Sequence, residues 1–419
     1  MTSPVWHPFT QHGLFPVLPV AVRDEGAYVT TADGRRVLDA ISSWWVITHG
    51  HRHPRITAAI KSQVDALDQV IFAEFTHEAA ELLARRLVAM APHGLNHVFF
   101  SDSGSTSVEV AIKMAVGFWR RSKPRHRIIV MDHSYHGDTI GAMSVGERGP
   151  FTAAYGPLLF GVSNIPFPWP TREQDCFDSL EALCRSGDAA ALIIEPLVLG
   201  AGGMLMYSTD VLAQLRSICA AHGVLFIADE VMTGWGRTGK LFACERAGIT
   251  PDITCYSKGL TGGTLPLAVT LCTDEIFAAH FSDNPREAFF HSSSFTANPI
   301  ACAAALANIE IWETEPVLDR IAAVSAAQTT QLARFRDDRR FTAVRQTGTI
   351  TAMDVASADP GYFSGLGPRL KEVFHAAGVL LRPLGNTIYV LPPYCVTADD
   401  LAMTYDAIGF AVDAVAPHR

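Results

Sequence analysis

The sequence predicts an α/β fold with a mostly parallel central sheet covered by helices, and a smaller α+β domain beside it. Two patterns carry this prediction. Short, continuously apolar runs of strand length recur through the middle of the chain, and stretches of helical length separate them. The third observation is size, because 419 residues can bury a large core and are typically divided between two domains.

The predicted elements follow in chain order. A hairpin signal at Ala32, Asp33 and Gly34 separates two short alternating runs, and the pattern from about 55 to 90 is helical. Candidate strands then lie at residues 97–100, 127–131, 191–195, 224–228, 253–256 and 267–271. Candidate helices lie at residues 107–121, 209–222 and 298–313.

After about residue 315 the pattern changes. A helix at 316–336, a strand-turn-strand over 379–391 and a final helix at 400–416 are expected. We therefore expect residues 56–315 to form the large domain. Residues 1–55 and 316–419, from both ends of the chain, should form the smaller α+β domain.

Composition excludes several classes of function. The net charge is -9 and no stripe of lysine and arginine occurs, which disfavours nucleic acid and anionic membranes as partners. The eight cysteines form no Cys-x-x-Cys pair, so neither a zinc site nor a disulfide framework is indicated. No apolar run reaches the roughly 18–20 residues of a spanning helix, and the N-terminus does not resemble a secretory signal. A cytoplasmic protein is expected.

Lys258 is the most informative residue. It follows an apolar, strand-like run and opens a glycine-rich loop, a position where desolvation lowers the pKa of an amine and makes it nucleophilic. Asp229 likewise ends the apolar run 224–228. A terminal acid and a terminal lysine on two buried strands are typical of pyridoxal phosphate (PLP) sites, because the cofactor's pyridine nitrogen needs an anion and its aldehyde needs an amine.

Two segments have the composition of anion sites. In residues 101–109, Gly104 and Ser105 stand in a turn that feeds a helix, and Thr106 and Glu109 have the spacing of a capping box. Residues 291–299 place three hydroxyls before an alanine-rich helix. An ordinary capped helix is the competing interpretation in both places.

Three further sites in the sequence, with four side chains in all, have two interpretations each. Tyr135 follows a strand, where its ring could stack on a planar cofactor or simply plug the end of the sheet. Trp44 and Trp45, placed on a strand, would face opposite sides, so that one is core and the other lines a pocket. Arg382, in the predicted hairpin, could hold a substrate carboxylate or form an internal salt bridge.

The histidine-rich segments favour hydrogen-bonded loops over metal sites. His136 and Asp138 have no second histidine or acid at helical spacing. The cluster of His49, His51 and His53 lies in a turn and has no partner motif elsewhere. No metal is therefore expected. For Arg237, which stands among glycines, a structural ion pair is the favoured interpretation.

Together, the segments 228–239 and 257–263 closely resemble the signature of class III, fold-type I, PLP-dependent aminotransferases. The similarity covers nearly the whole chain. Further segments resemble a narrower family, the 7,8-diaminopelargonate synthases of biotin biosynthesis (adenosylmethionine-8-amino-7-oxononanoate aminotransferases). These segments are residues 6–10, 42–45, 101–105, 135–139, 200–204 and 381–383.

This resemblance implies a homodimer with active sites at the subunit interface, and the following roles. Lys258 would bind PLP covalently and move the proton, Asp229 would hold the pyridine nitrogen protonated, and Tyr135 would stack on the ring. The remaining cofactor contacts would be Val231, Gly104 and Ser105, with Ser293 and Ser294 from the partner subunit. The substrate site would be lined by Phe9, Trp44, Tyr135, Ser292 and Arg382, with Arg382 meeting the carboxylate of 8-amino-7-oxononanoate.

The chain departs from the family pattern at two places. Many members have tyrosine where Phe9 stands, and that hydroxyl is associated with the S-adenosylmethionine donor, whereas members that use lysine have phenylalanine. Ser292, Ser293 and Ser294 stand where members commonly have Gly-Pro-Thr. The alternatives are another class III ω-aminotransferase with a different amine and keto acid, or a catalytically silent PLP-binding or nucleotide-binding regulatory protein.

Overall fold

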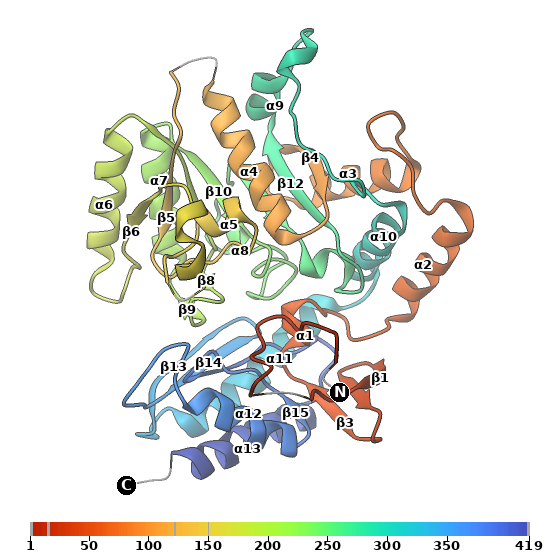
Figure 1. The fold of residues 1–419 in the computed structure, drawn as a ribbon, viewed down its shortest axis with the longest axis vertical. Coiled ribbons are helices and arrows are strands. Elements are labelled where there is room, and N and C mark those ends of the chain that lie inside the picture. Colours follow the sequence, from red (N-terminus) through yellow and green to blue (C-terminus); the bar gives the residue numbers. More distant parts are fainter. Residues whose placement is uncertain (1–2, 15–16, 121–122, 150, 417–419) are drawn as a thin grey trace.

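The computed structural model describes residues 3–14, 17–120, 123–149 and 151–416. The upper part of the molecule in Figure 1 is built on one seven-stranded sheet, and the lower part carries two smaller sheets with their helices. Both termini lie in the lower part. This arrangement agrees with the predicted α/β fold, while the predicted domain boundaries at residues 55 and 315 remain predictions.

The large sheet has the strand order β4-β12-β11-β10-β7-β5-β6. Its strands are β4 (Leu95–Ser101), β12 (Ala268–Thr273), β11 (Ile253–Tyr256), β10 (Leu225–Asp229), β7 (Ala189–Ile194), β5 (Arg127–Met131) and β6 (Ser163–Ile165). Among these seven strands, β12 alone runs in the direction opposite to the other six, so the sheet is mostly parallel, as predicted.

Alternate residues of the central strands pack into two different cores. Ile193 and Ile227 belong to the cluster that includes α4, whereas Ile194 and Phe226 belong to the cluster that includes α6 and α7. A sheet covered on both faces needs apolar residues at every strand position, which explains the continuous apolar runs. The helices of this part are α2 (Pro54–Ala66), α3 (Glu78–Met90), α4 (Gly104–Trp119), α5 (Ile140–Ser144), α6 (Glu173–Arg185), α7 (Thr209–Ala221), α8 (Ala243–Arg246), α9 (Asp274–His280) and α10 (Pro299–Thr314).

Helix α4 begins earlier than the capping spacing of Thr106 and Glu109 predicts. Ser103 is the N-cap, and it forms a reciprocal capping box with Thr106. The Glu109 carboxylate instead accepts hydrogen bonds from Thr139 Oγ1 at 2.6 Å and Gly141 N at 2.8 Å. The predicted cap is therefore wrong, and the helix N-terminus lies at Gly104 and Ser105.

The lower part combines segments from both ends of the chain. One sheet contains β1 (Ala21–Glu25), β2 (Tyr28–Thr31), β3 (Arg36–Asp39) and β15 (Val379–Leu380), and the other contains β13 (Phe341–Thr347), β14 (Ile350–Val355) and β16 (Thr387–Val390). The helices are α1 (Ser42–Trp45), α11 (Val317–Leu332), α12 (Leu366–Ala376) and α13 (Ala398–Val415). A two-stranded ribbon, β8 (Val198–Leu199) and β9 (Leu205–Met206), lies where the two parts meet.

The predicted strand-turn-strand over 379–391 is wrong as a hairpin. Strand β15 pairs in parallel with β3, whereas β16 pairs with β14 in the other sheet. The two strands pair with other partners instead of with each other, because β3 and β14 each have a free edge to which β15 and β16 can hydrogen-bond. Arg382 therefore lies in a connection between two sheets. The hairpin predicted around Gly34 is confirmed by the antiparallel pairing of β2 with β3.

No helix in the described part of the chain combines the length and the hydropathy that a membrane span requires.

Candidate active site

The carboxyl ends of two neighbouring strands create the site. Strands β10 and β11 are parallel, and Asp229 is in register with Cys255. Lys258 follows just beyond the end of β11, so its side chain and that of Asp229 emerge at the same edge of the sheet. Edges of this kind are the usual ligand sites of open α/β sheets.

At this edge lies a cavity of about 410 Å³, a size typical of small-molecule sites. It brings together all the predicted site residues except three serines. The predicted residues in its lining are Phe9, Trp44, Gly104, Ser105, Tyr135, Asp229, Val231, Lys258 and Arg382. Ser292, Ser293 and Ser294 lie outside it.

The Lys258 amine lies deep in the cavity. Burial lowers its pKa from the ordinary 10.5 to about 8, although Asp229 and Glu195 act in the opposite direction. Its Nζ lies 4.6 Å from the centroid of the Trp45 ring. An amine with this pKa is partly neutral near pH 7, as a nucleophile or a proton acceptor must be.

This pKa predicts a pH-dependent stability. The folded state disfavours the protonated lysine, so Lys258 costs stability below about pH 8, and the cost disappears as the pH rises toward 10.5. We expect Lys258→Met to raise the unfolding free energy of the cofactor-free protein by roughly 3 kcal/mol more at pH 7 than at pH 10. Urea unfolding at the two pH values measures the difference. An equal gain at both would contradict a depressed pKa.

The neighbouring acids Asp229 and Glu230 have different surroundings. Asp229 Oδ2 lies 2.7 Å from Nδ1 of His136, whose N–H donates to the carboxylate, and Oδ1 accepts from Val231 N at 3.1 Å. Glu230 accepts from the amides of Ala243 and Cys244 and does not line the cavity. Only Asp229 is therefore available to a ligand.

His136 confirms the expected hydrogen-bonded loop, and no cluster of metal-ligating side chains occurs within the described ranges of the chain. It is also a site residue that sequence reasoning missed. Its imidazole is buried against Asp229 and orients the carboxylate. Its position, next to Tyr135, was the signal that could have indicated this.

Glu195 is a second missed residue. It lines the cavity and accepts from the backbone amides of Tyr135 and Gly200, both at 2.9 Å. Burial raises the pKa of this carboxyl to about 7, and the nearby Asp229 acts in the same direction. The carboxylate fixes the backbone from which the Tyr135 ring projects. Like Asp229, it directly follows a buried strand, which was the available signal.

The N-terminus of α4 reaches the cavity at Gly104 and Ser105. The first turn of a helix presents free amides and a positive dipole end, which suit a phosphate. The Ser105 hydroxyl accepts from Asp138 N at 3.2 Å. A Cβ on residue 104 would lie 2.7 Å from Val231 Cγ1, so glycine is needed here for close packing against Val231.

Aromatic rings and one arginine form the outer wall. Phe9 and Trp44 pack edge to face with centroids 5.7 Å apart, and the guanidinium carbon of Arg382 lies 5.1 Å from the centroid of the Trp44 ring. Arg382 donates to the carbonyl oxygen of Phe9 at 2.9 Å. No acid in the described part of the chain forms an ion pair with it. The prediction that Arg382 forms an internal salt bridge is therefore wrong. The Arg382 side chain is part of the cavity wall.

Trp44 and Trp45 do not lie on a strand. Residues Ser42 to Trp45 all have positive φ, at 53°, 50°, 88° and 71°, and form a left-handed turn. Trp45 is buried and Trp44 is 38% exposed, yet both line the cavity. The strand placement was wrong because such a turn costs roughly 1–2 kcal/mol per residue and has no local signal outside glycine.

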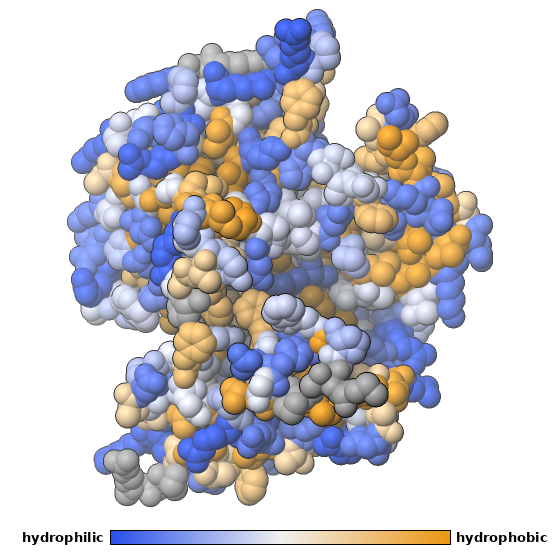
Figure 2. Space-filling model, viewed as in Figure 1, coloured by the Kyte–Doolittle hydropathy of each residue, from blue (hydrophilic) through white to orange (hydrophobic). Residues whose placement is uncertain are grey.

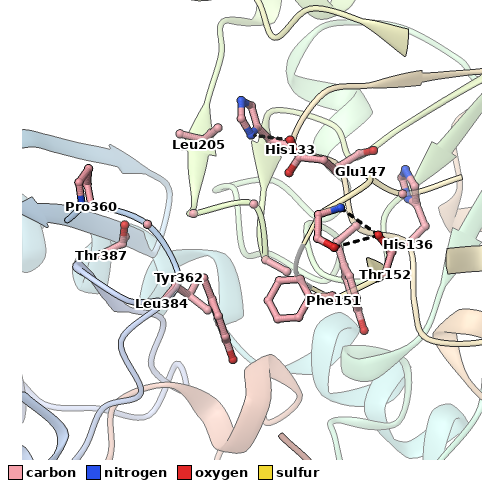
Figure 3. A pocket seen from close by; sticks show the side chains of 18 of the residues that line it. His133, His136, Glu147, Phe151, Thr152, Leu205, Pro360, Tyr362, Leu384 and Thr387 are labelled. Atoms are coloured by element: carbon pink, nitrogen blue, oxygen red, sulfur yellow. Dashed lines mark hydrogen bonds and ion pairs between the residues drawn. The ribbon is translucent and has the colours of Figure 1, made fainter. Parts of the chain in front are cut away.

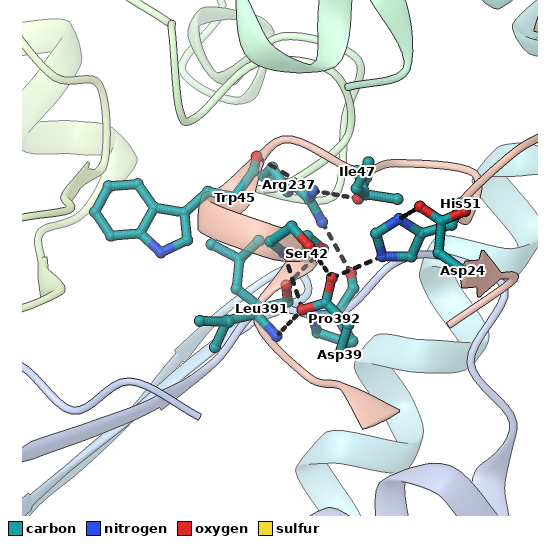
Figure 4. A network of polar contacts seen from close by, with 11 residues as sticks. Asp24, Asp39, Ser42, Trp45, Ile47, His51, Arg237, Leu391 and Pro392 are labelled. Atoms are coloured by element: carbon teal, nitrogen blue, oxygen red, sulfur yellow. Dashed lines mark hydrogen bonds and ion pairs between the residues drawn. The ribbon is translucent and has the colours of Figure 1, made fainter. Parts of the chain in front are cut away.

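Arg237 is fully buried, and no acid within the described ranges forms an ion pair with it. It donates to the carbonyl oxygens of Pro392 at 2.8 Å and Ile47 at 2.7 Å, as Figure 4 shows. Burial lowers the pKa of this guanidinium below its ordinary range. The predicted ion pair is wrong, since carbonyl oxygens from two distant segments satisfy the charge. His49 and His51 are also buried and hydrogen-bonded, to Asn308 and Asp39.

A second cavity of about 500 Å³ adjoins the first and shares Tyr135, His136 and Phe151 with it. Figure 3 shows Tyr362 and Leu384, from the lower part of the molecule, facing His133 and Phe151 from the upper part. The two cavities thus open together where the two parts of the molecule meet.

Comparison with known proteins identifies the family. The profile described as aminotransferase class-III matches residues 10–412. The chain belongs to the class-III aminotransferases.

Curated relatives of this aminotransferase include the adenosylmethionine-8-amino-7-oxononanoate aminotransferase of Synechococcus elongatus, 47% identical over 98% of this chain and 99% of the relative. The protein of the same name from Geobacter sulfurreducens is 39% identical over 98% and 96%. Among solved structures, the protein of that name from Methanocaldococcus jannaschii has a TM-score of 0.94 at 33% identity, covering 99% of this chain and 97% of that one.

Another solved structure, a PLP-bound amine transaminase from an uncultivated Pseudomonas species, has a TM-score of 0.92 at 33% identity and covers 99% of both chains. Class-III aminotransferases are PLP enzymes, which confirms the predicted cofactor. The residues of this aminotransferase fit PLP, since one cavity holds an amine, a carboxylate, a helix N-terminus and the Tyr135 ring. The buried Nε2 of His136 also has no hydrogen-bond partner among the described residues.

Ser292, Ser293 and Ser294, which were predicted to contact cofactor and substrate, lie outside the cavity of their own chain. Ser293 Oγ donates to the Asp102 carboxylate, Ser292 Oγ donates to the Ser293 carbonyl at 3.1 Å, and the Ser294 carbonyl accepts from Gln69 at 2.7 Å. Their expected contribution to a cofactor site belongs to a second copy of the chain and is taken up below.

Proposed function

We propose that this aminotransferase transfers an amino group to 8-amino-7-oxononanoate, giving 7,8-diaminononanoate in biotin biosynthesis. The donor would be S-adenosylmethionine or lysine. A cytoplasmic location is part of the same proposal. One observation carries the substrate assignment: the aromatic wall of the cavity contains an arginine, Arg382, without an acid as partner among the described residues. A long apolar chain that ends in a carboxylate matches such a wall. The relatives named for this activity span nearly the whole chain.

The residues divide the work in this proposal as follows. Bound PLP supplies a carrier for the amino group and an acceptor for the electrons released at the substrate carbon. Lys258 would hold the cofactor covalently through its amine, and once the donor's amine has displaced it, the freed amine would accept the proton from the substrate carbon and return it in the second half of the reaction. Asp229, oriented by His136, would keep the pyridine nitrogen protonated. Tyr135 and Val231 line the cavity where the ring would lie, and Gly104 and Ser105 would bind the phosphate at the helix N-terminus.

Phe9 bears on the identity of the donor. Its ring packs between Trp44 and Phe151, with centroid distances of 5.7 Å and 5.9 Å, and it has no hydroxyl to donate to a polar donor molecule. The proposal is tested by mixing the PLP-bound protein with S-adenosylmethionine or with lysine, following the cofactor absorbance, and then adding 8-amino-7-oxononanoate. Conversion by one donor and reversal by the ketone are expected.

The outcome separates this proposal from the alternatives. If neither donor converts the cofactor but another amine does, the protein is a class-III ω-aminotransferase with different substrates. If no amine does, the protein binds PLP without transaminating.

Arg382 gives a further prediction. Arg382→Leu should raise KM for 8-amino-7-oxononanoate about 100-fold, because a charged hydrogen bond to the carboxylate contributes about 3 kcal/mol, whereas the donor half-reaction with lysine should change far less. Steady-state kinetics with each substrate varied measures the two effects. Arg336, an exposed arginine, provides the matched control as Arg336→Leu. An equal loss toward both substrates would contradict carboxylate recognition.

The proposal includes a homodimer. Ser293 and Ser294 would reach the phosphate, and Ser292 the substrate, in the partner's cavity. In support, large apolar side chains are exposed on one side of the molecule, where Figure 2 shows an apolar surface around α2 and the segment after it. They include Val64, Ile71 and Phe75, which are 52%, 59% and 61% exposed. Surfaces of this kind are typical of subunit interfaces. Sedimentation equilibrium should give twice the mass of one chain.

A further inference from the structure

The left-handed turn formed by Ser42 to Trp45 requires an explanation beyond local sequence. Four consecutive residues with side chains adopt a conformation that glycine alone accepts freely, and two of them are cavity-lining tryptophans. The direction of both indole rings depends on this backbone. Whatever holds the turn therefore holds one wall of the active cavity.

A single buried carboxylate makes most of the polar contacts at the start of the turn. Asp39 Oδ1 accepts from Ser43 N at 2.9 Å and from Ile41 N at 3.4 Å, and Oδ2 accepts from Ser43 Oγ at 2.7 Å. Asp39 has no exposed surface. A buried carboxylate is stable only when it is hydrogen-bonded and paired, and His51 lies 2.9 Å from Oδ2. The other ring nitrogen of His51 lies 3.3 Å from Asp24, as seen in Figure 4.

The rest of the turn is seated on the upper part of the molecule. Arg237 donates to the carbonyl oxygens of Trp45 and Ile47 at 3.4 Å and 2.7 Å. A Cβ on Gly263 would lie 2.5 Å from the backbone of Val46, and one on Gly200 would lie 3.2 Å from the Trp45 ring. The end of the turn therefore packs closely against two glycines, at positions where a larger residue would collide with it, and Asp39 holds its start.

We propose that Asp39, supported by His51, is a positioning residue of the aminotransferase: it holds the turn left-handed and thereby places Trp44 and Trp45 in the wall of the cavity. Asp39 does not line the cavity. Its effect reaches the substrate through Trp44, which stands beside Arg382, and the lysine through Trp45, whose ring lies under the amine. The inference rests on the proposed function only for the choice of ligand used below.

The test compares Asp39→Asn with Asp24→Asn in the PLP-bound protein. The first substitution keeps the size of the side chain but removes its charge and one acceptor, while Asp24 contacts the same histidine from the far side and makes no contact with the turn. The probe is nonanoate, a nine-carbon carboxylate without a ketone or an amine, titrated by calorimetry. We expect Asp39→Asn to bind nonanoate roughly tenfold more weakly, and Asp24→Asn to bind it like the parent protein. The near-ultraviolet circular dichroism of the tryptophans should change only in Asp39→Asn.

A second variant tests the reason for the effect. Glycine accepts positive φ without strain, so Ser43→Gly added to Asp39→Asn should restore most of the nonanoate affinity and of the tryptophan spectrum. Asp39→Asn with unchanged spectrum and affinity, or a failure of glycine to rescue, would overturn the proposal. If Asp39→Asn does not fold, Ser43→Ala replaces it, because this substitution removes one hydrogen bond to Asp39. Ser43→Ala should weaken nonanoate binding about threefold. An unchanged tryptophan spectrum and an unchanged affinity in Ser43→Ala would also overturn the proposal. If the parent protein does not bind nonanoate, the tryptophan spectrum alone decides the inference, and the proposed substrate is decided by the transamination assay described above.

Discussion

Lys258→Ala should lower kcat for transamination by about 10⁴-fold, because one amine both anchors the cofactor and transfers the proton. Among the residues that the structure describes, no other lysine lines the cavity, so no described neighbour can replace it. Stopped-flow or steady-state assays with the reacting donor measure the loss. In the parent protein, borohydride should make the cofactor linkage permanent, and the labelled peptide should contain residue 258.

The matched control for this prediction is Lys240→Ala. Lys240 lies on an exposed loop close in sequence but outside the cavity, and its loss should leave kcat unchanged. A Lys258→Ala protein that transaminates at a normal rate, or a borohydride label on another peptide, would exclude the role assigned to Lys258.

Asp229→Asn should lower kcat roughly 100-fold while the protein still folds and binds the cofactor. An amide cannot hold the pyridine nitrogen protonated, and the loss of one charged hydrogen bond corresponds to about 3 kcal/mol. The contact with His136 can persist, because an amide oxygen still accepts from the imidazole N–H. Rate measurements on the cofactor-loaded variant separate this effect from weak cofactor binding.

Glu230→Gln serves as the matched control. Glu230 is the next residue along the chain, is equally buried, and faces the amides of Ala243 and Cys244. Burial raises the pKa of its carboxyl to about 7. Glutamine keeps the size of this side chain and one of its two acceptor oxygens, so the change stays at the start of α8 and outside the cavity. We expect this variant to keep its kcat. If both variants lost the same activity, a general disturbance of the strand end would explain the result, and the specific role of Asp229 would be wrong.

Local patterns predicted the parts of the site that lie at the ends of strands. Asp229 and Lys258 each follow an apolar run, and parallel strands bring their carboxyl ends to one edge, so their meeting follows from two local signals and one rule of topology. Glu195 also follows a buried strand and lines the cavity, but it was placed inside the predicted strand 191–195 and was not predicted as a site residue. His136 was placed in the right kind of loop, but its partner 93 residues away could not be inferred from its neighbours in sequence.

The conformations that depend on distant contacts could not be predicted. A tandem of tryptophans looks extended by propensity, yet Asp39 and Arg237 hold it in a left-handed turn. Strands β15 and β16 were expected to pair with each other and instead joined different sheets, because β3 and β14 offered longer-range partners. Arg237 was predicted to form an ion pair with an acid, but its guanidinium donates hydrogen bonds to backbone carbonyl oxygens instead.

The sequence by itself determined the alternation of buried strands and helices, and with it the acid and the lysine at one sheet edge, because apolar periodicity and terminal polar residues are local properties of the chain. Only the tertiary structure decided the direction of the two indole rings, the lack of an acidic partner for Arg382 among the described residues, and the contact of His136 with Asp229. Each of these features depends on hydrogen bonds and packing between residues far apart in the chain. Which partners form these contacts depends on which groups are buried together when the chain folds.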